Sequence, residues 1–158
     1  MTHEEHVALQ EKNDFTQTEK IFTRIFNEYG YSCEFQQTEQ YSHYDMILKV
    51  KKNAKKKRYN VEIKTKNIDL ETYDSLPLTT YKYASILDST KEDETALVIF
   101  LVNGEEYFIF NLSELNTCEC ELRLWRVQSE QLSSKKKHRV EEPTFFIPIS
   151  LCVYNGII

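Results

Sequence analysis

The chain is poor in glycine, proline and paired cysteines. Among its 158 residues there are three Gly, three Pro and four Cys, which excludes collagen-like and low-complexity proteins. The cysteines, at positions 33, 118, 120 and 152, contain no C-x-x-C pair and no regular spacing. This pattern favours reduced thiols over a disulfide framework or a zinc site, so we expect an intracellular, cytoplasmic protein.

A long hydrophobic run is also lacking. The longest, Ala96 to Val102, is far shorter than the roughly 20 apolar residues that cross a bilayer. The first residues are polar and acidic, so no signal peptide is predicted. We therefore expect a soluble chain with no membrane partner, and 158 residues are enough for one domain with a sizeable core.

Positive charge is scarce overall but concentrated in one stretch. The chain has 20 Lys and Arg against 25 Asp and Glu, a net charge of −5. Lys49 to Lys66 holds nine basic residues and one acid, Glu62, a local charge of +8, and the other residues carry −13. Such a stretch can steer a polyanion to one place, or it can be a solvated hairpin whose lysines prevent edge-to-edge pairing. A smaller basic cluster runs from Lys135 to Arg139.

The spacing of apolar residues predicts one domain at residues 14–158, preceded by a polar extension at residues 1–13. Asp14 to Tyr29 has the spacing of a helix, and its apolar stripe includes one acid, Glu19. A second helix is expected from Pro77 to Leu87. Alternation and β-branched content predict strands at residues 31–38, 44–52, 58–66, 95–102, 106–112, 122–127 and 144–149.

The order of these elements indicates a fold class. The strands at 44–52 and 58–66 are expected to form a hairpin, and Asn103-Gly104 predicts a second one. Residues 129–142 are expected to be a polar loop, and Pro148 suggests that the last strand is an edge strand. Strands interrupted by helices predict an α/β domain with a mixed central β-sheet flanked by helices.

Three acids and one lysine in this pattern match the needs of phosphodiester hydrolysis. Hydrolysis requires charge shielding at the phosphoryl oxygens and an activated water, and a divalent cation supplies both. Mg²⁺ prefers carboxylate and carbonyl oxygens. Asp45 at the start of one strand, Glu62 on the next, and the backbone carbonyl of Ile63 are therefore candidate ligands. Lys64 shares a face with Glu62 and is the candidate for orienting or deprotonating the water, with Glu19 supporting the site from the helix.

Each of these residues also has a structural interpretation. Glu62 and Lys64 would then be an ordinary strand face with cross-strand pairing to lysines of the neighbouring strand. Glu19 would form an ion pair with Lys64, and Asp45 would be a turn residue before its strand.

Together the residues resemble the PD-(D/E)xK nuclease superfamily, whose fold is restriction-endonuclease-like. The resemblance rests on Asp45, the basic hairpin, Glu62-Ile63-Lys64 and the preceding Glu19, and Tyr44 stands where the motif's name has proline. It implies metal-dependent cleavage of nucleic acid, usually DNA, with Mg²⁺ as the cofactor and Mn²⁺ as a substitute. It also assigns metal binding to the two strand carboxylates, the catalytic lysine to Lys64 and an accessory acid to Glu19.

We therefore expect a Mg²⁺-dependent DNA endonuclease. The expected catalytic set is Asp45, Glu62, Lys64 and Glu19, and the expected metal ligands are Asp45, Glu62, Ile63 and Glu19. Contacts to the nucleic-acid backbone are expected from the basic residues Lys51, Lys55, Lys56, Lys57, Arg58 and Lys66, and from the cluster at 135–139. Because one small active site cuts one strand at a time, cleavage of a duplex would favour a homodimer.

Two other functions remain open at this point. The chain can be a catalytically inactive nuclease-fold module that binds nucleic acid or a protein partner, which the acidic remainder of the chain favours. It can also be a structural or assembly subunit with no site. Binding of Mg²⁺ or Mn²⁺ that depends on Asp45 and Glu62 distinguishes the enzyme from the binding module, and a structure in which Glu19 lies far from Asp45 and Glu62 would favour the subunit with no site.

Overall fold

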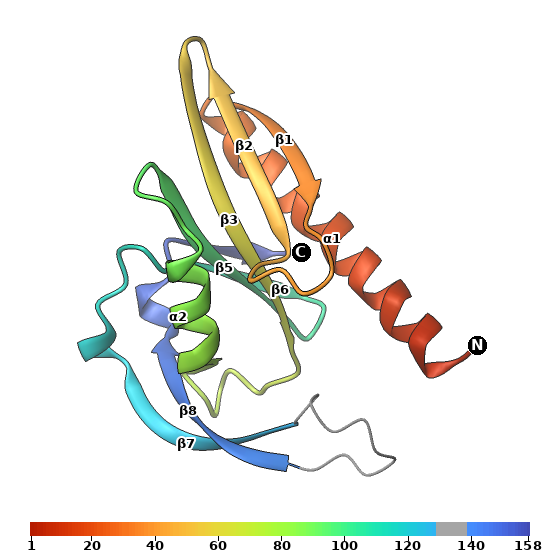
Figure 1. The fold of residues 1–158 in the computed structure, drawn as a ribbon, viewed down its shortest axis with the longest axis vertical. Coiled ribbons are helices and arrows are strands. Elements are labelled where there is room, and N and C mark those ends of the chain that lie inside the picture. Colours follow the sequence, from red (N-terminus) through yellow and green to blue (C-terminus); the bar gives the residue numbers. More distant parts are fainter. Residues whose placement is uncertain (129–138) are drawn as a thin grey trace.

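The protein is built around a six-stranded mixed sheet with a helix on each face (Figure 1). The structure, a computed structural model, describes residues 1–128 and 139–158. The sheet has the strand order β1-β2-β3-β5-β6-β9, and these strands are β1 (Ser32–Gln37), β2 (Met46–Lys52), β3 (Lys55–Lys66), β5 (Glu94–Val102), β6 (Glu106–Asn111) and β9 (Tyr154–Ile157). All neighbours are antiparallel except β3 and β5, which are parallel. The predicted α/β domain with a mixed central sheet is confirmed.

The parallel pair requires a crossover, and the crossover contains the second helix. The chain leaves β3, forms β4 (Ser75–Thr79) and α2 (Thr80–Asp88), and returns as β5. β4 belongs to a second, three-stranded sheet of order β4-β8-β7, with β7 (Glu121–Gln128) and β8 (Arg139–Pro148). Two short 3₁₀ turns, η1 (Thr117–Glu119) and η2 (Ile149–Leu151), complete the fold. α2 and the small sheet together cover one face of the large sheet.

The other face is covered by α1 (His3–Glu28), which extends through the expected polar extension. Thr2 caps it: its side chain accepts a hydrogen bond from the Glu5 N–H, and the Glu5 carboxylate accepts one from the Thr2 N–H. The helix therefore begins at His3 rather than at Asp14. Its buried side chains are those of Thr18, Ile21, Phe22 and Ile25. Among the described residues, no helix combines the length and the apolarity needed to span a membrane.

Strand alternation divides the core into two layers. On β2, Met46 and Leu48 are fully buried under α1, and on β5 the alternate residues Val98 and Phe100 are buried under α2 and the small sheet. β5 is therefore buried on both faces, as its β-branched sequence predicts. Both predicted hairpins are present, and their turns have left-handed residues at Asn53 and at Asn103-Gly104.

Several boundaries differ from the sequence-based expectation. Pro77 lies in β4 rather than in a helix, and α2 begins only after Thr79, whose hydroxyl accepts from the Lys82 N–H. Pro148 ends β8, but β8 is the central strand of its sheet, so the predicted edge strand is wrong. Residues 139–142 belong to β8 rather than to a loop, and residues 129–138 lie outside the described residues. β9 was not predicted.

Candidate active site

The register of β2 and β3 brings Asp45 and Glu62 to one face of the large sheet. Met46 pairs with Val61, and the Asp45 N–H donates to the Val61 carbonyl at 2.9 Å, so Asp45 lies opposite Glu62. Met46 and Val61 point into the layer under α1. Because successive side chains alternate, Asp45 and Glu62 point to the opposite face, toward α2. We call this the site face and the other one the α1 face.

Glu62 is the most unusual residue of the site face. It is only 3% exposed, yet it is a carboxylate. Its Oε1 atom lies 3.2 Å from the Lys64 ammonium and 3.3 Å from the Lys82 ammonium, whereas its Oε2 atom is buried without a hydrogen-bond partner. Burial, and secondarily the neighbouring Asp45 carboxylate, raise the pKa of Glu62, and the two lysines act in the opposite direction. One of the two carboxylate oxygens of Glu62 therefore has no hydrogen-bond partner.

Asp45 holds the adjoining backbone and is itself exposed. Its Oδ2 atom accepts a hydrogen bond of 2.8 Å from the Ile63 N–H. In a strand the N–H and the carbonyl of one residue point to the same side, so the Ile63 carbonyl is directed toward the edge of β3 where Asp45 lies. Asp45 is close enough to Glu62 to raise its pKa, and the Ile63 carbonyl lies at the same edge of β3.

Lys82 is a member of this cluster that the sequence did not single out. It lies in the first turn of α2 and reaches Glu62 from the helix that covers the site face. The position of Lys82 depends on where α2 begins and on how the crossover packs over β3. Neither can be predicted from the residues around Lys82. The only signal is Thr79, a good N-cap residue three positions earlier.

Glu19 lies apart from this cluster. It is half-buried on α1, which packs on the α1 face, whereas Asp45 and Glu62 point to the site face. Within residues 1–128 and 139–158 no three His, Cys, Asp or Glu side chains are gathered closely enough to hold a metal. The structure thus brings together Asp45, Glu62 and Lys64 and adds Lys82, and the part assigned to Glu19 stays a prediction.

The basic residues expected to contact nucleic acid have different surroundings. Arg58 is engaged: it forms an ion pair of 2.9 Å with Glu94 and donates to the Tyr44 hydroxyl. Lys66 is half-buried, and burial followed by the neighbouring Lys64 lowers its pKa. The hairpin lysines Lys51, Lys55, Lys56 and Lys57 are all exposed. In the cluster at 135–139, residues 135–138 fall outside the part of the chain that the structure describes.

The oxygen atoms of Asp45, Glu62 and the Ile63 carbonyl are of the kind that a hard divalent cation binds. Mg²⁺ and Mn²⁺ take carboxylate and carbonyl oxygens and keep several waters, so two protein carboxylates and one carbonyl are a sufficient protein contribution. The observation that tests this fit is the Oε2 atom of Glu62, a buried acceptor without a partner. A cation at that oxygen would also offset the mutual repulsion of the two carboxylates.

Of the comparisons with known proteins, the one with solved structures found matches. No protein-family model and no curated protein sequence matches the chain. Among solved structures, the chain is similar to Hjc, a Holliday junction resolvase from the archaeal hyperthermophile Archaeoglobus fulgidus, with a TM-score of 0.45 and 13% sequence identity over 90% of either chain. The site described above rests on the residues of this chain alone.

We expect Glu62→Gln to stabilise the metal-free protein at neutral pH. Because the folded-state pKa of Glu62 lies above its ordinary value of 4.5, the stability contributed by this residue is lost as the pH rises from 4.5 through the folded pKa. Glutamine removes that loss, and each 1 kcal/mol regained raises the Tm of a chain of this size by about 2–4 °C. Thermal unfolding of both proteins measured across pH gives a difference that grows with pH and disappears below 4.5.

The matched control is Glu105→Gln, which neutralises an exposed carboxylate outside the site. Its stability should follow that of the parent at every pH. A Glu62→Gln protein that unfolds at lower temperature than the parent at neutral pH would contradict the prediction, because the two lysine pairs would then outweigh the cost of burial.

Proposed function

We propose that the chain is a metal-dependent nuclease that hydrolyses phosphodiester bonds, with DNA as its substrate and Mg²⁺ or Mn²⁺ as its cofactor. The observation that carries the proposal is the buried Glu62 carboxylate beside Asp45, with one oxygen lacking any partner. An incompletely paired buried charge is costly. The presence of this charge in the sheet, next to a second acid and a lysine, is explained if its unpartnered oxygen binds a metal ion.

Each residue then has a distinct part. Asp45, Glu62 and the Ile63 carbonyl would hold the cation, which would supply charge shielding at the phosphoryl oxygens and help to activate a water. The Lys64 ammonium lies on the site face beside Glu62, where it orients the attacking water and neutralises a phosphate oxygen. Lys82 contacts the Glu62 carboxylate from α2, where its ammonium offsets the buried charge while no cation is bound.

The wider surface fits a large anionic substrate. The basic hairpin formed by β2 and β3 contains most of the local charge of +8, in a chain whose remainder is acidic. Phosphate contacts from lysines position a nucleic acid without reading its sequence. Cutting both strands of a duplex requires two copies of the site, so a homodimer is the arrangement proposed for such cleavage.

A second candidate function is a nuclease-like module that binds nucleic acid or a protein without cutting. The observation that favours it is the pairing of the Glu62 Oε1 atom with two ammonium groups, 3.2 and 3.3 Å away. Two lysines neutralise much of the charge that would otherwise attract a cation. Calorimetric titration with Mg²⁺ and Mn²⁺ separates the two functions, since the module predicts no binding that depends on Asp45 and Glu62.

Loss of a metal ligand or of the lysine should abolish cleavage. We expect Asp45→Ala and Lys64→Ala to reduce the rate on plasmid DNA in Mg²⁺ by at least about 100-fold, since charge shielding at the phosphate is worth several kcal/mol. The matched controls, Glu105→Ala and Lys91→Ala, remove exposed residues of the same charges and should cut at the parent rate. Equal rates for the site variants and the parent would exclude the proposed mechanism.

Removing Lys82 should tighten cation binding. The ammonium of Lys82 competes with a cation for the Glu62 carboxylate, so we expect Lys82→Gln to lower the Kd for Mn²⁺ by about three- to tenfold, or about 1 kcal/mol. Titration calorimetry of the parent, Lys82→Gln and the exposed control Lys91→Gln measures it. Weaker binding by Lys82→Gln would mean that its contact with Glu62 is needed to present the ligand.

A further inference from the structure

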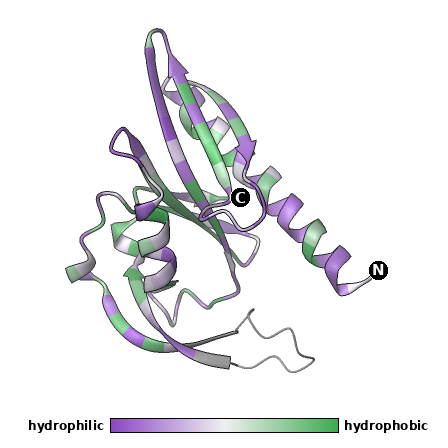
Figure 2. Cartoon of the chain, viewed as in Figure 1, coloured by the Kyte–Doolittle hydropathy of each residue, from purple (hydrophilic) through white to green (hydrophobic). Residues whose placement is uncertain are grey.

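The β2–β3 hairpin extends beyond the rest of the sheet, and its two faces differ. Figure 1 shows its tip projecting away from α2 and the small sheet, and Figure 2 shows that its outer part is hydrophilic. The register assigns each lysine to a face: Lys51 lies opposite Lys56 on the site face, whereas Lys52 and Lys57 alternate with them on the α1 face.

On the α1 face the ammonium groups of Lys52 and Lys57 are already engaged. Lys52 donates to the Tyr29 carbonyl at 2.9 Å and lies 5.4 Å from the centre of the Tyr31 ring. Lys57 lies 5.2 Å from the centre of the Tyr59 ring. Such contacts use the ammonium group and the aliphatic stem to cover the aromatic residues between α1 and the sheet. These two lysines therefore have a structural role.

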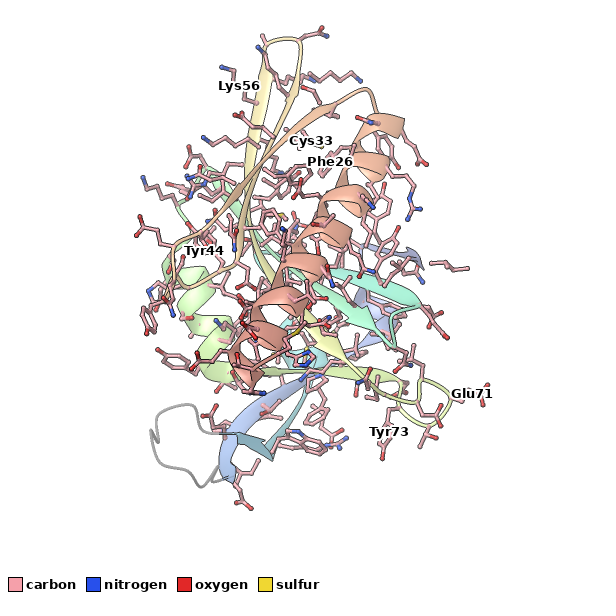
Figure 3. The ribbon with its side chains drawn as sticks, turned by 90° about the vertical axis from the view of Figure 1, so that its right-hand side faces the viewer. Phe26, Cys33, Tyr44, Lys56, Glu71 and Tyr73 are labelled. Carbon is pink, nitrogen blue, oxygen red and sulfur yellow. The ribbon has the colours of Figure 1, made fainter. Side chains whose placement is uncertain are left out.

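On the site face the outer lysines have no partner. Among the described residues, the ammonium groups of Lys51 and Lys56 form no hydrogen bond and no ion pair, and the two residues face each other directly across the hairpin, next to Ser32 of β1. Like charges directly opposite each other are unfavourable, and a bound phosphate would relieve the repulsion. Figure 3 shows Lys56 near the hairpin tip, whereas Cys33 lies near Phe26, a residue of α1.

These lysines border a concave surface. A hollow of about 640 Å³ is lined by the outer row, Ser32, Lys51 and Lys56, by the next row, which includes Lys49 and Arg58, and also by Lys57. The acids Glu34 and Asp93 also line it, and Arg58 is paired with Glu94. The hollow therefore has more positive than negative side chains, and its outer row contributes two ammonium groups without an ion pair.

The outer row and the candidate active site are on the same face of β3, and the buried Asn60 lies between them. Lys56 and Glu62 are both on β3 and both on the site face. Six residues of strand separate them, which is about 20 Å. A duplex advances about 3.4 Å per base pair, so a molecule that contacts both places spans about 6 base pairs beyond the scissile phosphate.

The side chains between these two places point to a duplex rather than a single strand. On β2 and β3 the site-face residues from the outer row to Asn60 and Ile47 are lysine, arginine, asparagine and isoleucine, with no aromatic ring. Proteins that hold single strands stack the bases on aromatic side chains. Here the aromatic residue of the hairpin, Tyr59, is on the α1 face. The nearby ring of Tyr44 is outside the two strands and is bonded to Arg58 through its hydroxyl. Strands that offer charge without rings fit a backbone whose bases are paired inside a helix.

We propose that the site face of the β2–β3 hairpin, through Lys51 and Lys56, anchors the phosphate backbone of the duplex that flanks the cut, and that the α1 face takes no part. This inference rests on the proposed function, because it takes the Glu62 cluster as the point of cleavage. It divides the basic residues of the hairpin into a binding set and a structural set that the sequence treats alike.

The test compares two double variants that remove the same charge from opposite faces of the hairpin. Lys51→Gln/Lys56→Gln removes the two outer positive charges of the site face, and Lys52→Gln/Lys57→Gln is the matched control. Binding of a fluorescent duplex is measured by anisotropy in a chelating buffer, at several salt concentrations, and thermal unfolding verifies that each variant is folded. We expect the site-face variant to lose about 2 from the slope of log K against log salt, and the control to keep the parent slope.

Two further arms sharpen the test. A duplex that extends less than about 6 base pairs past the cut should show no difference between the parent and the site-face variant. The single strand of the same sequence should bind the parent more weakly than the duplex. Equal effects of both double variants, no effect of either, or tighter binding of the single strand would overturn the inference.

The cleavage assay shows which proposal has failed. A parent that cuts duplex DNA in Mg²⁺ while both double variants bind alike contradicts the duplex anchor and leaves the nuclease function standing. A parent that binds duplex with the expected dependence on the hairpin face, yet cuts nothing in Mg²⁺ or Mn²⁺, supports the anchor and contradicts the hydrolytic function.

Discussion

The buried carboxylate of Glu62 is the constraint around which this fold is arranged. A carboxylate in the middle of a sheet is stable only if cations or hydrogen bonds replace the lost water. Lys64 supplies one cation from the same strand, and Lys82 supplies another from the crossover helix. Both act on the same oxygen, so the arrangement tolerates the charge without saturating it. The remaining oxygen, Oε2, has no hydrogen-bond partner and is the proposed metal ligand.

Strand parity explains how much of the site was predictable from the sequence. Alternation is a local property, so the hairpin, the buried Met46 and Leu48, and the common face of Glu62 and Lys64 follow from the sequence, and the structure has them. The opposite orientation of Asp45 and Met46 follows in the same way. A shift of one residue in the register would exchange the two faces, and the apolar residues of β2 exclude it.

What depends on distant parts of the chain could not be predicted. Lys82 reaches Glu62 because the crossover between the parallel strands β3 and β5 carries α2 over the site face. The place of Glu19 depends on which face α1 covers, and periodicity gives the stripe of a helix but not its partner. β9 pairs with β6 through residues almost fifty positions away, and its short sequence contains a glycine that is atypical of strands.

On β2 and β3 the two faces of the sheet also separate stability from function. On the α1 face, Met46, Leu48 and Val61 are fully buried, and apolar burial of this kind is the main source of folding free energy. The free energy gained by this burial offsets the cost of a buried charged group on the other face of the same strands. The lysines of the hairpin follow the same division, since those on the α1 face cover aromatic rings. Residues on the site face can therefore be selected for charge and chemistry, because the strands that present them are held from the opposite side.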